Sequence, residues 1–287
     1  DAKGNRKFTY SLKGVGKYRE GMIPIRNEKG WGFMNKEGKV MVEPAYTRVG
    51  GFHVGLASGR TAKGWGYIRP DGNWGIKPQF LRTYDFEDGI ALVKYRYRYG
   101  YVKPDGSYLI PPVYKRAEPM KDGQAIVRKN KLYGIVGEDG KWIVRPKYTR
   151  LKPAGNEYLI RRNGKMGFLN RAGEEILPPK YARISRRDTI LGCARVKGNK
   201  GWGMIDSSRN LVVPAQYDHV SNMDKGVCLV RKSFLYGAYS WQGEELLPAQ
   251  YSSIRKGKVP GMLIASKHAL YGNSEKDTVY YDLPPMT

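Results

Sequence analysis

Short runs of apolar residues alternate with polar, glycine-containing turns along the whole chain. Two kinds of run recur. One ends in proline, as in "YLIPP" and "WIVRP", and the other has alternating apolar and polar positions, as in "GIALVKY" and "GQAIVRK". Runs of this length, bounded by turns and without the 3.6-residue period of an amphipathic helix, are typical of β-strands. The pattern therefore predicts an all-β protein.

The strand pattern repeats at a nearly fixed interval. A bulky residue followed by glycine marks each copy, and successive copies begin 33 to 36 residues apart. A fixed period of this size indicates a solenoid, a propeller or an array. We therefore predict eight repeats of about 34 residues each. Their bulky residues are Trp31, Trp65, Tyr99, Tyr133, Met166, Trp202, Tyr236 and Tyr271.

A tight turn follows the glycine in most copies. It is of the Asp-Gly type, as at Asp71 and Asp105. Asp and Gly tolerate the positive φ angles that short hairpins need. The acidic residues are therefore predicted to shape the turn rather than to perform acid–base chemistry. The sixth copy has Arg209-Asn210 at this point, where Asn210 is expected to supply the left-handed residue.

Each repeat is predicted to contain three short antiparallel strands and a fourth at the aromatic residue that follows the proline. A unit of this size cannot bury its apolar face alone, so neighbouring units must cover it. The positions at which the repeat pattern starts and stops favour a closed β-propeller of seven to eight blades. In that arrangement residues 1–20 complete the last blade of a single domain, 1–287. An open β-solenoid is the alternative.

These features resemble the bacterial WG-repeat family, and "WGFMNKEGKVMVEPAY" (31–46) and "WGYIRPDG" (65–72) carry the resemblance best. It extends from about Gly21 to Pro285. It implies a repeat array of the kind often found in exported or envelope proteins, and it implies no catalytic residues. Because the chain also begins at Asp1 rather than Met, we expect an exported protein that is periplasmic or associated with the outer membrane.

The repeated glycine is expected to lie where a second backbone or ring approaches closely. The bulky residue before it is expected to be part of the core between repeats, with any polar atom reaching a partner. A stacking platform for bases or sugars is the functional alternative.

Candidate catalytic and metal-binding residues are sparse. The three histidines, His53, His219 and His268, are far apart and have no metal-ligand spacing. Cys193 and Cys228 are expected to point to opposite faces, with Cys228 as a small buried residue. No phosphate-binding loop, serine elbow or recognisable carboxylate pair occurs. We therefore predict a non-enzymatic protein without cofactor or metal, and an enzyme that acts on a glycan is a minor alternative.

The composition is strongly basic. The chain has 51 Lys and Arg residues against 26 Asp and Glu, a formal net charge of +25. Such an excess favours anionic partners. One basic set precedes the next bulky residue and is predicted to be mainly a solvated rim. It comprises Lys94, Arg96, Arg98, Arg128, Lys129, Lys131, Arg161, Arg162, Lys165, Arg231 and Lys232.

A second basic set has one member in each of five consecutive repeats, two residues after the aromatic. Equal phase in a repeat protein means equal position, so these guanidinium groups are expected to accumulate on one surface. The planar guanidinium matches carboxylate and phosphate geometry. We predict a scaffold or protein-interaction module that docks through this surface onto an acidic protein or a phosphorylated envelope polymer. Binding of nucleic acid or another polyanion is the alternative. The predicted residues are Arg48, Arg82, Arg116, Arg150 and Arg183, followed by His219.

Overall fold

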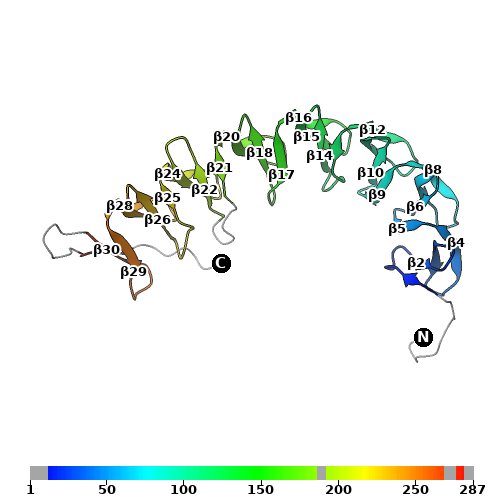
Figure 1. Cartoon of the computed structure of the whole chain (residues 1–287), viewed down its shortest axis with the longest axis horizontal. Helices are drawn as coiled ribbons and strands as arrows, with labels where there is room; N and C mark the ends of the chain where they lie inside the picture. Colours follow the sequence, from blue (N-terminus) through cyan, green and yellow to red (C-terminus); the bar gives the residue numbers. More distant parts are fainter. Residues whose placement is uncertain (1–11, 186–191, 268–275, 281–287) are drawn as a thin grey trace, which may run out of the picture. The chain divides into compact units, whose positions relative to one another are not determined.

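The structure, a computed structural model, describes residues 12–185, 192–267 and 276–280, and every regular element among them is a β-strand (Figure 1). The chain divides into two compact units, Asp1–Leu151 and Lys152–Thr287. The strands form small antiparallel sheets, each a meander in chain order. The all-β repeat prediction is confirmed, and ring closure stays a prediction. The eighth repeat start, Tyr271, lies outside the described residues.

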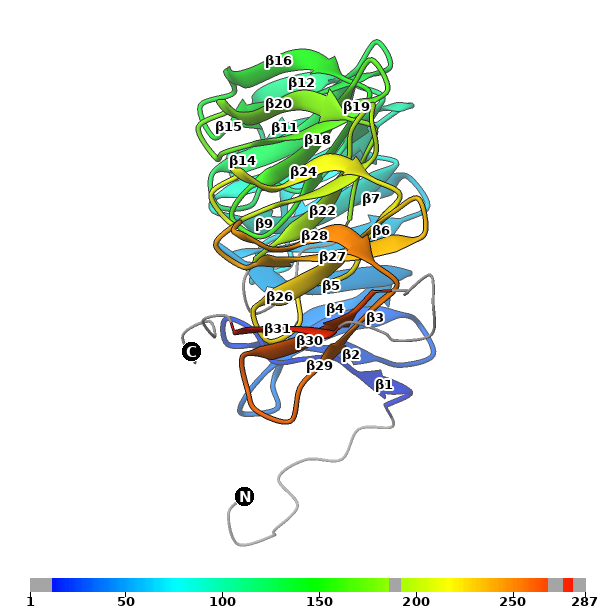
Figure 2. The same cartoon turned by 90° about the vertical axis from the view of Figure 1, so that its left-hand side faces the viewer.

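The first unit contains four four-stranded sheets, and Figure 2 shows β2, β3 and β4 side by side. The first two sheets consist of β1 (Gly14–Val15), β2 (Met22–Arg26), β3 (Trp31–Asn35), β4 (Val40–Tyr46) and of β5 (Arg48–His53), β6 (Leu56–Thr61), β7 (Gly64–Ile68), β8 (Trp74–Phe80). The next two consist of β9 (Arg82–Glu87), β10 (Ile90–Tyr95), β11 (Arg98–Val102), β12 (Tyr108–Tyr114) and of β13 (Arg116–Ala117), β14 (Gln124–Lys129), β15 (Leu132–Gly137), β16 (Trp142–Tyr148).

The boundary between the units falls within β17, and four further sheets follow. The first two consist of β17 (Arg150–Pro153), β18 (Tyr158–Arg162), β19 (Lys165–Leu169), β20 (Glu175–Tyr181) and of β21 (Arg183–Ile184), β22 (Ala194–Lys197), β23 (Trp202–Ile205), β24 (Leu211–Tyr217). The last two consist of β25 (His219–Val220), β26 (Val227–Lys232), β27 (Leu235–Ser240), β28 (Glu245–Tyr251) and of β29 (Ser253–Lys256), β30 (Met262–Ser266), β31 (Lys276–Tyr280).

The segment 1–20 is described only in part. Gly14–Val15 pairs with β2 and is therefore the first strand of the first sheet. Residues 1–11 and 281–287, on which the predicted completion of the last blade depends, lie outside the described residues.

A bulge in the proline-containing strand explains the repeated glycine. In the fourth sheet Tyr133 is paired with Tyr148 and Ile135 with Val144. Between these two pairs the chain advances four residues along β16 but only two along β15, which is a bulge in β16. The extra backbone pushes toward Gly134, where a Cβ atom would lie 2.4 Å from the Val144 carbonyl oxygen. The other six described copies show the same clash, at 2.2 to 2.7 Å. The expected close approach is confirmed, and the approaching group is backbone.

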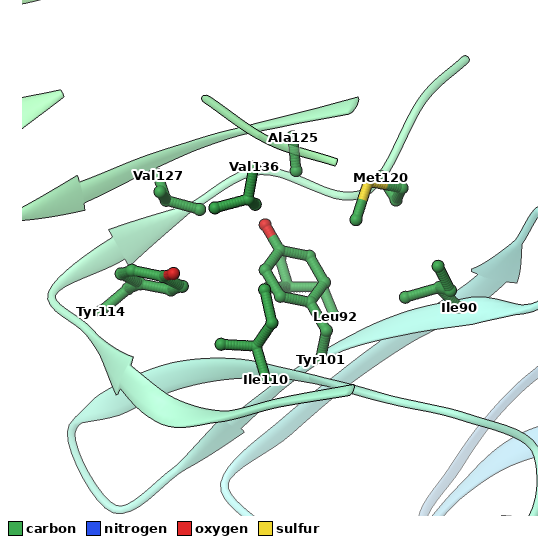
Figure 3. Close-up of a cluster of buried hydrophobic side chains, with 9 residues drawn as sticks. All are labelled: Ile90, Leu92, Tyr101, Ile110, Tyr114, Met120, Ala125, Val127 and Val136. Carbon is green, nitrogen blue, oxygen red and sulfur yellow. The ribbon is translucent and has the colours of Figure 1, made fainter. Parts of the chain in front are cut away.

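Apolar side chains between consecutive sheets form the core. Figure 3 shows one such cluster, in which the Tyr101 ring lies between Leu92 and Ile110 of its own sheet and Ala125 and Val136 of the next. The bulky residue of the ring–glycine pair packs against these clusters at Trp31, Trp65, Tyr99 and Trp202. These four rings therefore pack against the core between sheets, as predicted, and are themselves half-buried.

Two buried tyrosines also form hydrogen bonds that link consecutive sheets. The Tyr67 hydroxyl donates to the Tyr84 carbonyl at 2.6 Å, and the Tyr101 hydroxyl donates to the Glu118 carbonyl at 2.7 Å. Burial raises the pKa of both phenols far above the ordinary value, so each stays protonated and able to donate. The bonds satisfy polar groups that would otherwise be costly in the core.

The left-handed residue of the sixth turn is Arg209, with φ of 73°, and the prediction of Asn210 is wrong. Arg209 is buried and pairs with the Glu157 carboxylate, and its guanidinium lies 4.5 Å from the Phe168 ring centroid. These contacts stabilise a backbone conformation that an arginine rarely adopts. The Asn210 N–H donates instead to the Asp206 carboxylate at 2.8 Å.

Both cysteine predictions are confirmed. Cys228 is fully buried, and burial raises the pKa of its thiol to about 12. Cys193 and Cys228 lie in one cluster between the β21–β24 and β25–β28 sheets, so Cys193 points from its sheet toward the following one and Cys228 points from its sheet toward the preceding one. The two therefore lie on opposite faces of their repeats, and Ala194, next to Cys193, packs on the other face of its sheet.

The bulge predicts that Gly134→Ala will be strongly destabilising. The added Cβ meets rigid backbone, so the free energy of unfolding should fall by about 3 kcal/mol. Gly137→Ala on the same strand is the control, because its Cβ would meet side-chain atoms at 3.1 Å or more. Urea denaturation measures both, and equal losses would contradict the assignment.

The hydroxyl bond between sheets predicts a loss of about 1–2 kcal/mol for Tyr101→Phe, because the Glu118 carbonyl loses its donor. Tyr108→Phe, at a ring that is 40% exposed, should change stability by less than about 0.5 kcal/mol. Thermal denaturation compares the two variants, and a neutral Tyr101→Phe would show that the hydrogen bond contributes nothing.

Candidate anion-binding site

The predicted arginines all occupy one structural position, the first residue of the first strand of a sheet. They begin β5, β9, β13, β17 and β21, and His219 begins β25. A single residue separates each from the last strand of the preceding sheet, for example Leu81 between β8 and β9. The Leu81 N–H donates to the Lys94 carbonyl at 2.7 Å, and Lys115 donates likewise to Arg128 at 3.1 Å. We call this end of each sheet the crossing end.

The six side chains are exposed at the crossing end. The residue that follows each is turned inward, and Thr83, Leu151 and Val220 are buried. None of the six forms an ion pair with another residue in the part of the chain that the structure describes. In the first unit Arg48, Arg82 and Arg116 lie on consecutive packed sheets, and in the second unit Arg183 and His219 do so. Arg150 begins β17 at the boundary between the units.

Five of these six residues lie directly opposite a second basic residue on the neighbouring strand. Like charges at directly opposed positions destabilise a sheet. Arg60 and Lys197 were not predicted as partners, although each partner precedes the bulky residue of its repeat by five positions. The pairs are Arg48–Arg60, Arg82–Lys94 and Arg116–Arg128 in the first unit, and Arg183–Lys197 and His219–Arg231 in the second.

The second-strand cation is held by the ring of the ring–glycine pair. Lys94 Nζ lies 5.3 Å from the Tyr99 centroid, and Arg128 Cζ lies 5.5 Å from the Tyr133 centroid. Such cation–π contacts offset part of the repulsion. Lys94 and Arg128 are half-buried, so the prediction of a solvated rim is wrong for them. The long side chains pack their stems along the ring, which composition alone does not show.

Carboxylates gather at the opposite end of the sheets, where the turns between third and fourth strands lie. The Asp71 carboxylate accepts the Asn73 N–H at 2.8 Å, and Asp105 accepts the Ser107 N–H at 2.8 Å. These bonds lower the pKa of both carboxyl groups. The predicted turn role of Asp71 and Asp105 is confirmed. These turns also contain Arg69 and Lys103, so this end holds charges of both signs, whereas the opposed residues at the crossing end are all basic.

The described residues contain no group of three or more His, Cys, Asp or Glu side chains arranged to hold a metal ion. Within the same residues no helix has the length and apolar character needed to cross a bilayer.

The repeat geometry agrees with a known sequence family. The model of the WG containing repeat matches residues 31–58, 65–98, 99–133, 133–165, 166–188 and 202–233. The chain belongs to the WG-repeat family. Its WG-repeat copies are the sheets described above, with the bulge beside each ring–glycine pair. No curated protein matches the WG-repeat chain.

Several solved structures are similar to this WG-repeat protein at low sequence identity. A eukaryotic initiation factor shares 9% identity over 97% of this chain and 91% of its own, with a TM-score of 0.40. Hsv2p of Kluyveromyces lactis shares 10% identity over 79% and 92%, with a TM-score of 0.33. PorZ, a surface component of the type-IX secretion system of Porphyromonas gingivalis, shares 10% identity over 90% and 44%, with a TM-score of 0.29.

The opposed cations predict an asymmetry between two arginines of one pair. Arg116→Ala removes repulsion and should leave the free energy of unfolding unchanged or raise it by up to about 0.5 kcal/mol. Arg128→Ala also loses the ring contact with Tyr133 and should lower it by about 1 kcal/mol. Chemical denaturation of the two variants tests this, and the reverse order would show that Arg116 is structural.

Proposed function

We propose that this WG-repeat protein is a non-enzymatic, exported scaffold module that docks onto an acidic protein surface or a phosphorylated envelope polymer. The binding residues are Arg48, Arg82, Arg116, Arg150, Arg183 and His219. One observation carries the proposal, namely that a cation opposes a cation in four sheets, and His219 opposes Arg231 in a fifth. Folding alone does not favour such pairs. An anionic partner would turn the repulsion into attraction.

The geometry of the first unit suits a partner with repeated negative groups. Sheets packed face to face lie about 10 Å apart, so Arg48, Arg82 and Arg116 present guanidinium forks at regular steps. Several weak contacts along one partner add up through effective concentration. Arg82 is also positioned along its own strand, because its Cζ lies 4.8 Å from the Tyr84 centroid. Less side-chain freedom is then lost when it binds.

The difference in charge between the two ends of the sheets supports a defined docking direction. At the opposite end, the carboxylates of Asp71 and Asp105 lie beside Arg69 and Lys103, so that end attracts a polyanion less than the crossing end does. Export is proposed on the family resemblance, and it would place this surface among envelope components. A nucleic acid is the second candidate, since a net charge of +25 suffices for phosphate-led binding. The rings that contact the second-strand cations, such as Tyr99 and Tyr133, are half-buried and offer bases little stacking surface.

Charge reversal at the crossing end tests the proposal. The triple variant Arg48→Glu, Arg82→Glu, Arg116→Glu should bind polyphosphate and polyglutamate at least about tenfold more weakly, because three attractive groups become repulsive. Its thermal stability should be equal or higher, since each new carboxylate faces Arg60, Lys94 or Arg128. Isothermal titration at two salt concentrations measures the affinity, and a thermal melt measures the stability.

A matched control changes the same net charge elsewhere. Lys39→Glu, Lys103→Glu, Lys121→Glu alters three exposed lysines at the opposite end of the same unit, and either triple lowers the net charge from +25 to +19. Equal loss of binding in both triples would show that only the overall charge acts and would overturn the site. Tighter binding to duplex DNA than to both acidic polymers at both salt concentrations would favour the nucleic-acid alternative.

A further inference from the structure

Two aromatic side chains are far more exposed than other large apolar residues in the described part of the chain. Tyr97 is 84% exposed and Phe234 is 86% exposed. They occupy the same repeat position, two residues before the rings of Tyr99 and Tyr236. Tyr97 lies in the first unit and Phe234 in the second. Four other copies have lysine at this position, namely Lys29, Lys63, Lys131 and Lys200.

The backbone at Phe234 makes this exposure more unusual. Ser233 and Phe234 join β26 to β27 with φ angles of 49° and 70°. A two-residue turn with two positive φ angles favours Asn-Gly, and a bulky residue there is strained. The equivalent turn of the β18–β19 hairpin uses Asn163 and Gly164. That of the β14–β15 hairpin uses Asn130 and Lys131, with φ of 70° at Lys131, whose polar side chain extends into solvent. Phe234 therefore stabilises neither the turn nor the core, and strain of this kind clusters at functional positions.

The surroundings of both rings are cationic and partly apolar. Phe234 is followed by Leu235, which is 40% exposed, and preceded by the exposed Arg231 and Lys232. Tyr97 stands between the exposed side chains of Arg96 and Arg98. Both turns lie at the crossing end of their sheets, because Arg231 is paired with His219 and Lys94 with Arg82.

We propose that the Phe234 and Leu235 tip, and separately Tyr97 in the other unit, insert into the headgroup layer of a membrane that contains anionic phosphorylated lipids. An apolar side chain enters the boundary between headgroups and acyl chains, while neighbouring cations meet phosphates. Aromatic residues are enriched at this depth. The inference deepens the proposed function and rests on it, since the same crossing-end cations supply the attraction.

The shape of the tip favours a lipid surface over other anionic partners. A single projecting side chain needs no complementary pocket in a bilayer, whereas a protein partner would need one. A nucleic-acid base would stack on the ring but would leave Leu235 in water. A bilayer covers both side chains at once, so it accounts for the second exposed apolar residue as well.

Substitution of Phe234 tests the proposal with two readouts that move in opposite directions. Phe234→Asn in the full chain should raise the melting temperature, because Asn tolerates positive φ. It should also weaken partitioning onto phosphatidylcholine vesicles that contain phosphatidylglycerol by roughly tenfold, since the apolar contact is lost. Phe234→Trp is the matched control and should keep the partitioning. Vesicle co-sedimentation measures it, and phosphatidylcholine alone should bind little.

The experiments distinguish a failure of the membrane-insertion hypothesis from a failure of the proposed function. If Phe234→Asn and Tyr97→Asn leave vesicle partitioning unchanged, insertion is wrong, even where the arginine triple variant still loses polyanion binding. If Phe234→Asn weakens polyphosphate or DNA binding as much as vesicle binding, the ring serves a soluble polymer and the lipid assignment is wrong. A lowered melting temperature for Phe234→Asn would show that the ring is structural.

Discussion

The fold depends on one close approach, that of a bulged strand to the glycine of the third strand. Gly134 leaves room for the Val144 carbonyl, and the six other described copies repeat this arrangement. The proline lies within the bulge, where its lack of an N–H donor does not interrupt the sheet. The bulge also bends the fourth strand, so that its end is directed toward the next sheet. The ring, the glycine and the proline therefore belong to one structural arrangement, the bulge, and this explains why the three recur together.

The bulged fourth strand also positions the cations. The fourth strand ends at an aromatic residue, and one residue later the chain is already part of the next sheet, as at Leu81. The following residue is thus fixed in register opposite the second strand, where Arg82 faces Lys94. Repetition of one backbone arrangement therefore repeats the position of the pair, and the residues of each copy decide its charge. The same position in the last described sheet holds Ser253 opposite Ser266 and carries no charge.

Sequence alone predicts much of this architecture, because turn chemistry and alternation act locally. Asp71 and the Gly134 spacing are visible as patterns, and so is the equal phase of the arginines. Contacts between sheets are not local. The opposition of Arg116 and Arg128 depends on strand register, and the half-burial of Arg128 depends on a ring across the strand. Arg209 was missed because its partner Glu157 lies 52 residues away and makes an unfavourable backbone conformation stable.

The one-residue junction between sheets has a consequence for how such proteins evolve. A duplication or deletion that begins and ends at junctions such as Leu81 and Lys115 adds or removes one complete sheet with its hydrogen bonds intact. An added copy of a sheet that begins with arginine contributes one more outward cation at an unchanged register. Array length can therefore vary in whole steps among relatives, and valency toward a partner changes with it while the chemistry of each contact stays the same.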